Sequence, residues 1–64
     1  MSTKILRRKQ VEALVGKGRS AIYADVAQGR FPRPIPLGRR AVGWLENEVQ
    51  AWIEARVAER DSAA

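Results

Sequence analysis

Side chains that suit phosphate recognition gather in two short clusters of this chain: Lys17, Arg19, Ser20 and Tyr23, followed by Arg39 and Arg40. Lys and Arg neutralise phosphate oxygens, and Ser and Tyr hydroxyls donate hydrogen bonds to them. The planar guanidinium of an arginine also pairs with O6 and N7 of guanine. These residue types predict contact with a nucleic acid, with Arg19 as the side chain for a base edge.

The composition narrows the class of protein. The 64 residues carry 12 Lys and Arg against 7 Asp and Glu, a net charge of +5, which predicts a polyanionic partner. Because the chain has no Cys and no His, it has no disulfide, thiolate nucleophile, imidazole base or common zinc-ligand set. Its few carboxylates indicate no catalytic pair. We therefore expect no enzyme activity, no cofactor and no metal.

The charges divide the chain into two parts. Residues 1–44 hold ten basic and two acidic side chains, a net charge of +8, whereas residues 45–64 hold two basic and five acidic side chains, a net charge of −3. Carboxylates held against DNA would be repelled by its phosphates. The first part is thus the expected contact surface, and the second part is the expected support.

The spacing of apolar residues predicts two short helices. Val11, Leu14 and Val15 form one stripe of a helix from 8 to 15, and Gly16 is placed to end it. A second helix is expected over 19–28, and Gly29 is placed to end that one. Burial of one face, Ile22 and Val26, leaves the opposite face outward, with Arg19, Ser20, Tyr23 and Ala24. The pair predicts a helix-turn-helix around Gly-Lys-Gly, although that break alone is typical of ordinary helix connections.

The middle of the chain predicts a hairpin, and the end predicts a third helix. Three alternate prolines, Pro32, Pro34 and Pro36, exclude a helix there and favour an edge strand. Short strands are expected around residues 35–37 and 42–44, with Gly38-Arg39-Arg40 as the tip. A further helix begins near Glu46, with an apolar stripe of Val49, Trp52 and Ile53. The aromatic residues Phe31, Trp44 and Trp52 are expected in the core.

These elements predict one domain over residues 1–64, mainly α with a small β-hairpin wing, that is, a winged helix-turn-helix of three helices and two short strands. Residues 1–4 and 61–64 are expected to fray. In this fold the second helix enters the major groove, and the wing meets the backbone or the minor groove. The expected DNA contacts are Arg8, Lys17, Arg19, Ser20, Tyr23, Ala24, Arg39 and Arg40. Two alternatives remain, Tyr23 as a cover for the core edge and the arginine tip as a solvated turn.

Three stretches of the chain carry a family resemblance: ILRRKQVEALVG (5–16), GRSAIYADVAQGRFPRPIPLG (18–38) and RAVGWLENEVQAWIEAR (40–56). Together they resemble the AlpA family of phage and prophage transcriptional regulators, which are excisionase-like and related to MerR-type DNA-binding domains. The resemblance implies a winged helix, DNA binding through residues 19–28 and the wing, and a role in activating excision genes or directing site-specific recombination.

The chain departs from the usual family pattern in its second helix. Gly18 stands where a serine commonly caps the helix, and Ala21 stands where a threonine is common. Ala24 and Asp25 follow the tyrosine, where an arginine is often found. These changes remove phosphate contacts and place a carboxylate in the contact helix. One hypothesis is that Asp25 pairs with a nearby arginine and orients it.

The expected partner is double-stranded DNA, and a second copy of the chain is an expected partner as well, as a dimer or a DNA-templated oligomer. An integrase or another phage protein is a further candidate. The apolar runs are too short to span a bilayer, and no secretory signal is evident, so the expected location is the cytoplasm of a bacterial host, at the nucleoid. The alternatives are a recombination directionality factor and a protein-interaction module that docks through Val49, Trp52 and Ile53 without binding DNA.

Overall fold

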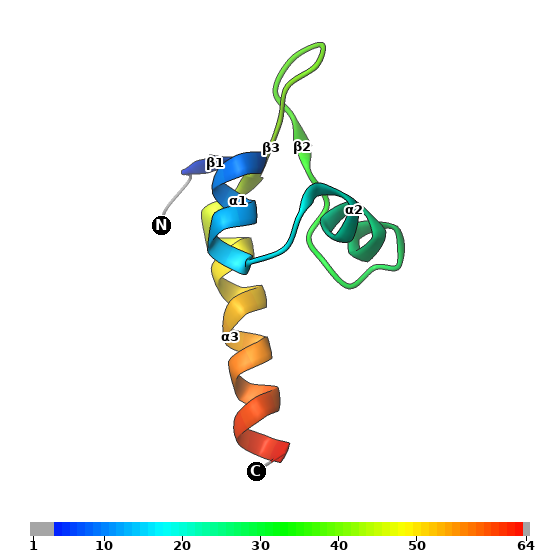
Figure 1. Ribbon diagram of the computed structural model, residues 1–64. Coiled ribbons are helices and arrows are strands. Elements are labelled where there is room, and N and C mark those ends of the chain that lie inside the picture. The colour runs from blue at the N-terminus through cyan, green and yellow to red at the C-terminus, as the bar shows by residue number, and fades with distance from the viewer. Residues whose placement is uncertain (1–3, 64) are drawn as a thin grey trace.

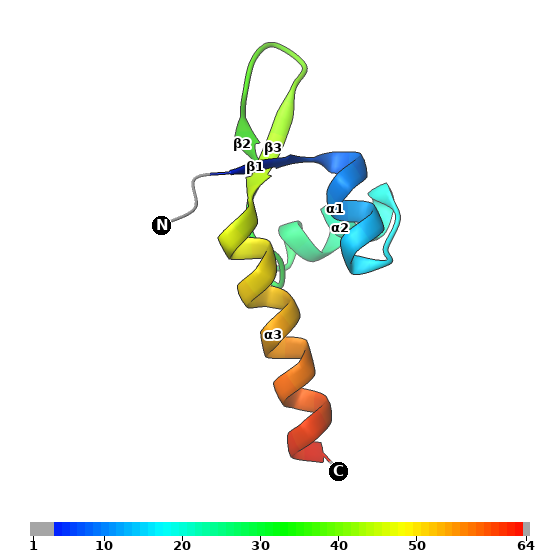
Figure 2. The same ribbon diagram turned by 90° about the vertical axis from the view of Figure 1, so that its left-hand side faces the viewer.

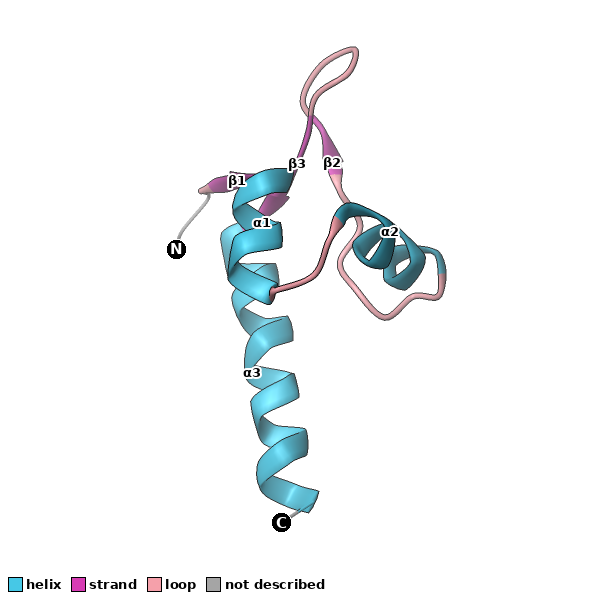
Figure 3. Ribbon diagram, in the orientation of Figure 1, coloured by secondary structure: helices cyan, strands magenta, loops and turns pink. Residues whose placement is uncertain are grey.

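The computed structural model describes residues 4–63 and contains helices and a small sheet (Figures 1 and 3). The elements in chain order are β1 (Ile5–Arg7), α1 (Arg8–Val15), α2 (Arg19–Ala27), β2 (Ile35–Pro36), β3 (Val42–Leu45) and α3 (Glu46–Ala63). Three helices and an antiparallel hairpin confirm the predicted class, a mainly α winged helix-turn-helix. The tip of the wing is the loop between β2 and β3.

Two glycines end the first two helices as their positions predicted. Gly16 has a φ of 68° and donates its N–H to the carbonyl of Glu12 at 2.9 Å. Gly29 has a φ of 74°, and Arg30 donates to the carbonyl of Asp25 at 2.8 Å, closing a Schellman-type end of α2. An L-residue rarely adopts this left-handed conformation, so each glycine fixes where its helix stops.

The sheet has a strand that the sequence analysis missed. Its order is β1-β3-β2, with both pairs antiparallel, so β3 is central and the proline-containing β2 lies at an edge, as predicted. The expected two strands are therefore three. β1 has only three residues and pairs Leu6 with Trp44. Such a short segment carries too little alternation to predict a strand, and its partner lies far away in the sequence.

The core draws on every helix and on the central strand. The buried apolar side chains are Leu6, Val11, Ile22, Phe31, Trp44 and Val49. The Trp44 ring lies 6.2 Å from the ring of Phe31, edge to face, and the Phe31 ring lies 5.1 Å from that of Trp52. Aromatic pairs at these separations pack favourably. Phe31 and Trp44 are core anchors as expected, and Trp52 packs against the core while partly exposed.

Two indole groups hold the proline-rich segment in place. Trp44 Nε1 donates to the carbonyl of Pro32 at 2.7 Å, and Trp52 Nε1 donates to the carbonyl of Arg30 at 2.8 Å. Residues 30–34 belong to no helix or strand, so their backbone groups need such partners. The chain is thereby fixed between α2 and the wing.

The wing and the end of α3 lie at opposite ends of the molecule (Figures 1 and 2). Val49, Trp52 and Ile53 in the first turns of α3 pack on the core, and the later turns project away from it. Lys4 and residues 61–63 belong to the termini that were expected to fray. The carbonyl of Lys4 accepts a hydrogen bond from the N–H of Glu46 at 2.9 Å, and α3 continues through residue 63. The rest of the termini expected to fray, residues 1–3 and 64, lies outside the described part. Within residues 4–63, no helix combines the length and apolarity that a membrane span requires.

Candidate nucleic-acid interface

Three of the eight residues that were expected to contact DNA, Arg19, Ser20 and Ala24, are exposed on α2. Ile22 is fully buried, and Val26 packs against the core, which turns the opposite face of the helix to solvent. Ser20 and Ala24 are exposed on that face one turn apart, and Arg19 is exposed at the first position of the helix. Exposed side chains in these positions are typical of a groove-reading helix. Their exposure follows from the burial of Ile22.

Tyr23 has a double environment. Its side chain is half-buried, and its ring centroid lies 6.2 Å from that of Trp44, so it covers an edge of the core. On its other side, the guanidinium of Arg19 lies 5.9 Å from the ring centroid, a cation–π distance. The position beside Trp44 agrees with the alternative in which Tyr23 covers the core edge, and its contact with DNA stays a prediction. The ring also limits the directions in which Arg19 extends.

The N-terminus of α2 offers backbone donors. Gly18 caps the helix with extended geometry, φ −81° and ψ 175°, and provides no side chain to accept from the first turn. The first N–H groups of a helix have no partner within it, and they attract anions. A phosphate beside Arg19 and Ser20 would meet these donors. The missing serine cap therefore leaves the backbone donors of this terminus for another acceptor.

Lys17 does not extend freely from the turn. Its Nζ lies 2.5 Å from Asp25 Oδ2 and 5.7 Å from the centroid of the Trp52 ring. The side chain of Asp25 is only 16% exposed. The hypothesis that Asp25 pairs with an arginine is therefore wrong, because its partner is a lysine that comes from the turn between the helices. The carboxylate of Asp25 is therefore paired and mostly buried, and it does not lie on the exposed face of α2.

The tip of the wing displays Arg39 and Arg40. Both side chains are exposed, and the tip closes with a hydrogen bond from the N–H of Leu37 to the carbonyl of Ala41 at 2.8 Å. β2 and β3 pair just behind the tip, Pro36 with Val42. Figure 1 shows that the loop between β2 and β3, which carries both arginines, forms the far end of the hairpin.

A basic cavity lies between the wing and the start of α1. It has a volume of about 250 Å³. We call it the corner cleft, and its lining residues are Arg7, Arg8, Lys9, Arg40 and Val42. Arg8, which was expected to contact DNA, forms an ion pair with Glu12 one turn further along α1. Arg7 and Lys9 were not predicted as contacts. The run of three cations at 7–9 was the only feature of the sequence that could have indicated a contact there. The sequence could not show that Arg40 lines the same cavity.

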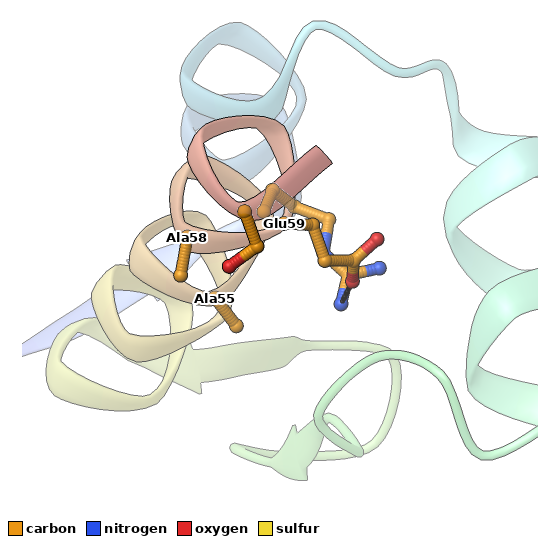
Figure 4. Close-up of a pocket in the computed structure, with 5 residues that line it drawn as sticks. Ala55, Ala58 and Glu59 are labelled. Carbon is orange, nitrogen blue, oxygen red and sulfur yellow. Dashed lines mark ion pairs between the residues drawn. The ribbon is translucent and has the colours of Figure 1, made fainter. Parts of the chain in front are cut away.

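A second hollow lies on the projecting part of α3 and has no such chemistry. Figure 4 shows Ala55, Ala58 and Glu59 on one side of this helix, with no other element closing the site. Arg56 and Glu59 there form an ion pair with each other. The hollow is an open helix face. The corner cleft differs, because its cations come from two parts of the fold, the start of α1 and the wing.

Comparisons with known proteins found a matching family model and a phage relative. The family model described as prophage CP4-57 regulatory protein (AlpA) matches residues 4–57. An uncharacterised protein of Enterobacteria phage P4, ORF88, is 42% identical over 57 residues, which is 89% of this chain. The chain spans 65% of the length of that phage protein.

Proposed function

The chain belongs to the AlpA family of prophage regulatory proteins, and from that membership we propose that it is a sequence-specific, double-stranded-DNA-binding transcriptional regulator. In this proposal α2 enters the major groove. The wing loop, residues 38–41, contacts the backbone or the minor groove. The family is regulatory, and the proposed action requires no catalysis.

The observation that carries the proposal is the exposed face of α2. Arg19, Ser20 and Ala24 face solvent on a helix that buried Ile22 fixes to the core. Arg19 supplies a guanidinium for guanine O6 and N7, Ser20 supplies a hydroxyl for phosphate, and the small Ala24 allows close approach to a base edge. The carboxylate of Asp25 is bound by Lys17, so it does not repel phosphates from this face.

The charge distribution supports the same orientation. The wing carries Arg39 and Arg40 with no acid beside them in the loop, whereas the projecting end of α3 lies at the opposite end of the molecule, where Glu54, Glu59 and Asp61 outnumber Arg56 and Arg60. DNA lying along α2 and the wing meets the basic end and avoids the acidic one. The electrostatic field of the protein thus favours docking with α2 and the wing toward the DNA over docking with the end of α3 toward it.

Selection of bound sequences from a random duplex pool tests this function. We expect a consensus of a few base pairs with a preferred guanine contact for Arg19. For the selected duplex, log K should fall against log salt with a slope of about −4 to −5, as neutralisation of roughly four to six phosphates requires. A protein-interaction module with an incidental basic face would instead retain no duplex at moderate salt.

We also propose that the protein assembles on DNA and acts there as a regulator. One 7.1 kDa module reads about one half-site, so we expect a dimer or a row of copies on DNA. Light scattering with and without a long target measures this, and a strict 1:1 complex would contradict it. A promoter reporter and an integrase-driven excision assay, each with and without the protein, distinguish a transcriptional regulator from a recombination directionality factor that works with an integrase.

A further inference from the structure

The corner cleft forms because a strand and a helix meet beside the wing. β1 ends at Arg7, which pairs with Gly43 of β3, and α1 begins at the next residue. Val42, also in β3, lies just after the wing tip that carries Arg40. The ladder between β1 and β3 therefore fixes Arg7 and Lys9 relative to the base of the wing. The cleft is a property of the folded sheet and not of a single flexible loop.

The charges of the corner cleft are largely uncompensated. Four cations line it, and Glu12 forms an ion pair with one of them, Arg8. Arg7, Lys9 and Arg40 have no carboxylate partner among residues 4–63. Like charges that line one cavity repel one another, and an anion between them relieves the repulsion. The cleft thus has the charge and the donors for a phosphate group.

On the premise of the proposed function, we propose that the corner cleft holds one phosphodiester of the DNA backbone. The guanidinium and ammonium groups of Arg7, Lys9 and Arg40 donate to its oxygens. Val42, half-buried in the wall of the cleft, packs against the adjoining deoxyribose. Inorganic phosphate would accept the same hydrogen bonds as a phosphodiester, but it has no deoxyribose to pack against Val42. The contact is independent of base sequence and joins the wing to the start of α1 through one phosphate.

Neutral variants of the two residues outside the wing test this proposal. We expect Arg7→Gln and Lys9→Gln each to weaken binding by about 3- to 10-fold at ~0.1 M salt, equally for a selected and a scrambled duplex, and each to reduce the salt slope by about 1. Arg7→Lys keeps the charge and should keep the slope. The control is Arg60→Gln, which removes one positive charge, paired with Asp61, from the last turn of α3. Circular dichroism and the Tm of each variant check folding.

A double-mutant cycle tests whether the cations share one phosphate. Lys9 and Arg40 come from different elements, and Arg40 lies in an exposed loop where Arg40→Gln leaves the packing intact. If both bind the same group, the double variant loses less affinity than the product of the two single losses. Strictly multiplicative losses would assign the two residues to separate phosphates and contradict the proposal.

The remaining outcomes separate this inference from the proposed function. If the wild-type protein binds a duplex while Arg7→Gln and Lys9→Gln behave like Arg60→Gln, the cleft proposal fails and the function stands. If the wild-type protein binds no duplex, the proposed function fails. A last experiment titrates the protein with inorganic phosphate and monitors the NMR amide shifts of residues 7–9 and 40. Saturation by free phosphate without any effect of these variants on duplex binding identifies a small-anion site and overturns the DNA contact.

Discussion

Lys17 Nζ lies 2.5 Å from Asp25 Oδ2, so an ion pair joins the turn before α2 to the second turn of that helix. The same ammonium lies 5.7 Å from the centroid of the Trp52 ring on α3. One lysine thus connects the proposed DNA-reading helix to the support helix. The orientation of α2 depends on this contact as well as on buried Ile22.

Removal of the carboxylate should weaken this connection. We expect Asp25→Asn to lower the free energy of unfolding by about 1 kcal/mol, because the pair is only partly exposed and the substitution leaves the lysine without its counter-charge. Urea denaturation measures the change. Glu54→Gln is the control, since this exposed acid on α3 has no ion pair within the described chain. A cycle with Lys17→Met that shows no coupling energy would contradict a stabilising pair.

The close approach of β1 to β3 requires a glycine at position 43. A Cβ there would lie 2.4 Å from Ile5 Cγ2 and 3.0 Å from the backbone oxygen of Leu6. The side chain of Ile5 can move, but the strand backbone cannot move without loss of the ladder. We expect Gly43→Ala to destabilise the fold by about 1 to 3 kcal/mol.

Gly38 provides the matched control for this substitution. A Cβ at Gly38 meets no atom within 4 Å, so Gly38→Ala should change stability by less than about 0.5 kcal/mol. Thermal and urea unfolding of both variants measure the difference. Equal effects at the two positions would show that the contact between β1 and β3 is not tight.

Local signals predicted the helices well. The spacing of Val11, Leu14 and Val15, with Gly16 behind them, placed α1 at its observed bounds, although Leu14 is exposed and does not join the core. Gly29 placed the end of α2 to within one residue. The alternate prolines predicted the edge strand because each proline removes a backbone donor whatever the tertiary structure. In all these cases the information lies within a few residues of the element that it determines.

Contacts between distant residues explain what the sequence analysis missed. β1 was missed because its partner, β3, lies almost forty residues further along the chain. Lys17 was expected at a phosphate, but it points to Asp25 and Trp52, and nothing in the turn itself reveals the position of either partner. The corner cleft depends on the same long-range pairing, which brings the run at 7–9 beside Arg40.

The indole N–H of Trp52 should matter for the segment before the wing. It donates to the carbonyl of Arg30, while the ring packs edge to face on Phe31. Trp52→Phe keeps an aromatic ring and removes the donor, so we expect a loss of about 1 to 2 kcal/mol in unfolding free energy. Amide hydrogen exchange over residues 29–34 should accelerate more than exchange in α1. Uniform acceleration across the chain would show that the hydrogen bond has no local role.

Arg19 should determine sequence preference, in contrast to the cations of the corner cleft. We expect Arg19→Ala to weaken binding to a selected duplex by about 1 to 3 kcal/mol and to flatten the preference at one base pair, because a bidentate contact to guanine is lost. Arg19→Lys keeps the charge but not the fork, so it should keep most of the non-specific affinity and lose the preference. Affinities for the selected duplex and for single-base variants of it, at one fixed salt concentration, measure both effects. If Arg19→Ala weakens all duplexes equally, the residue contacts phosphate, and another residue on the exposed face of α2 reads the bases.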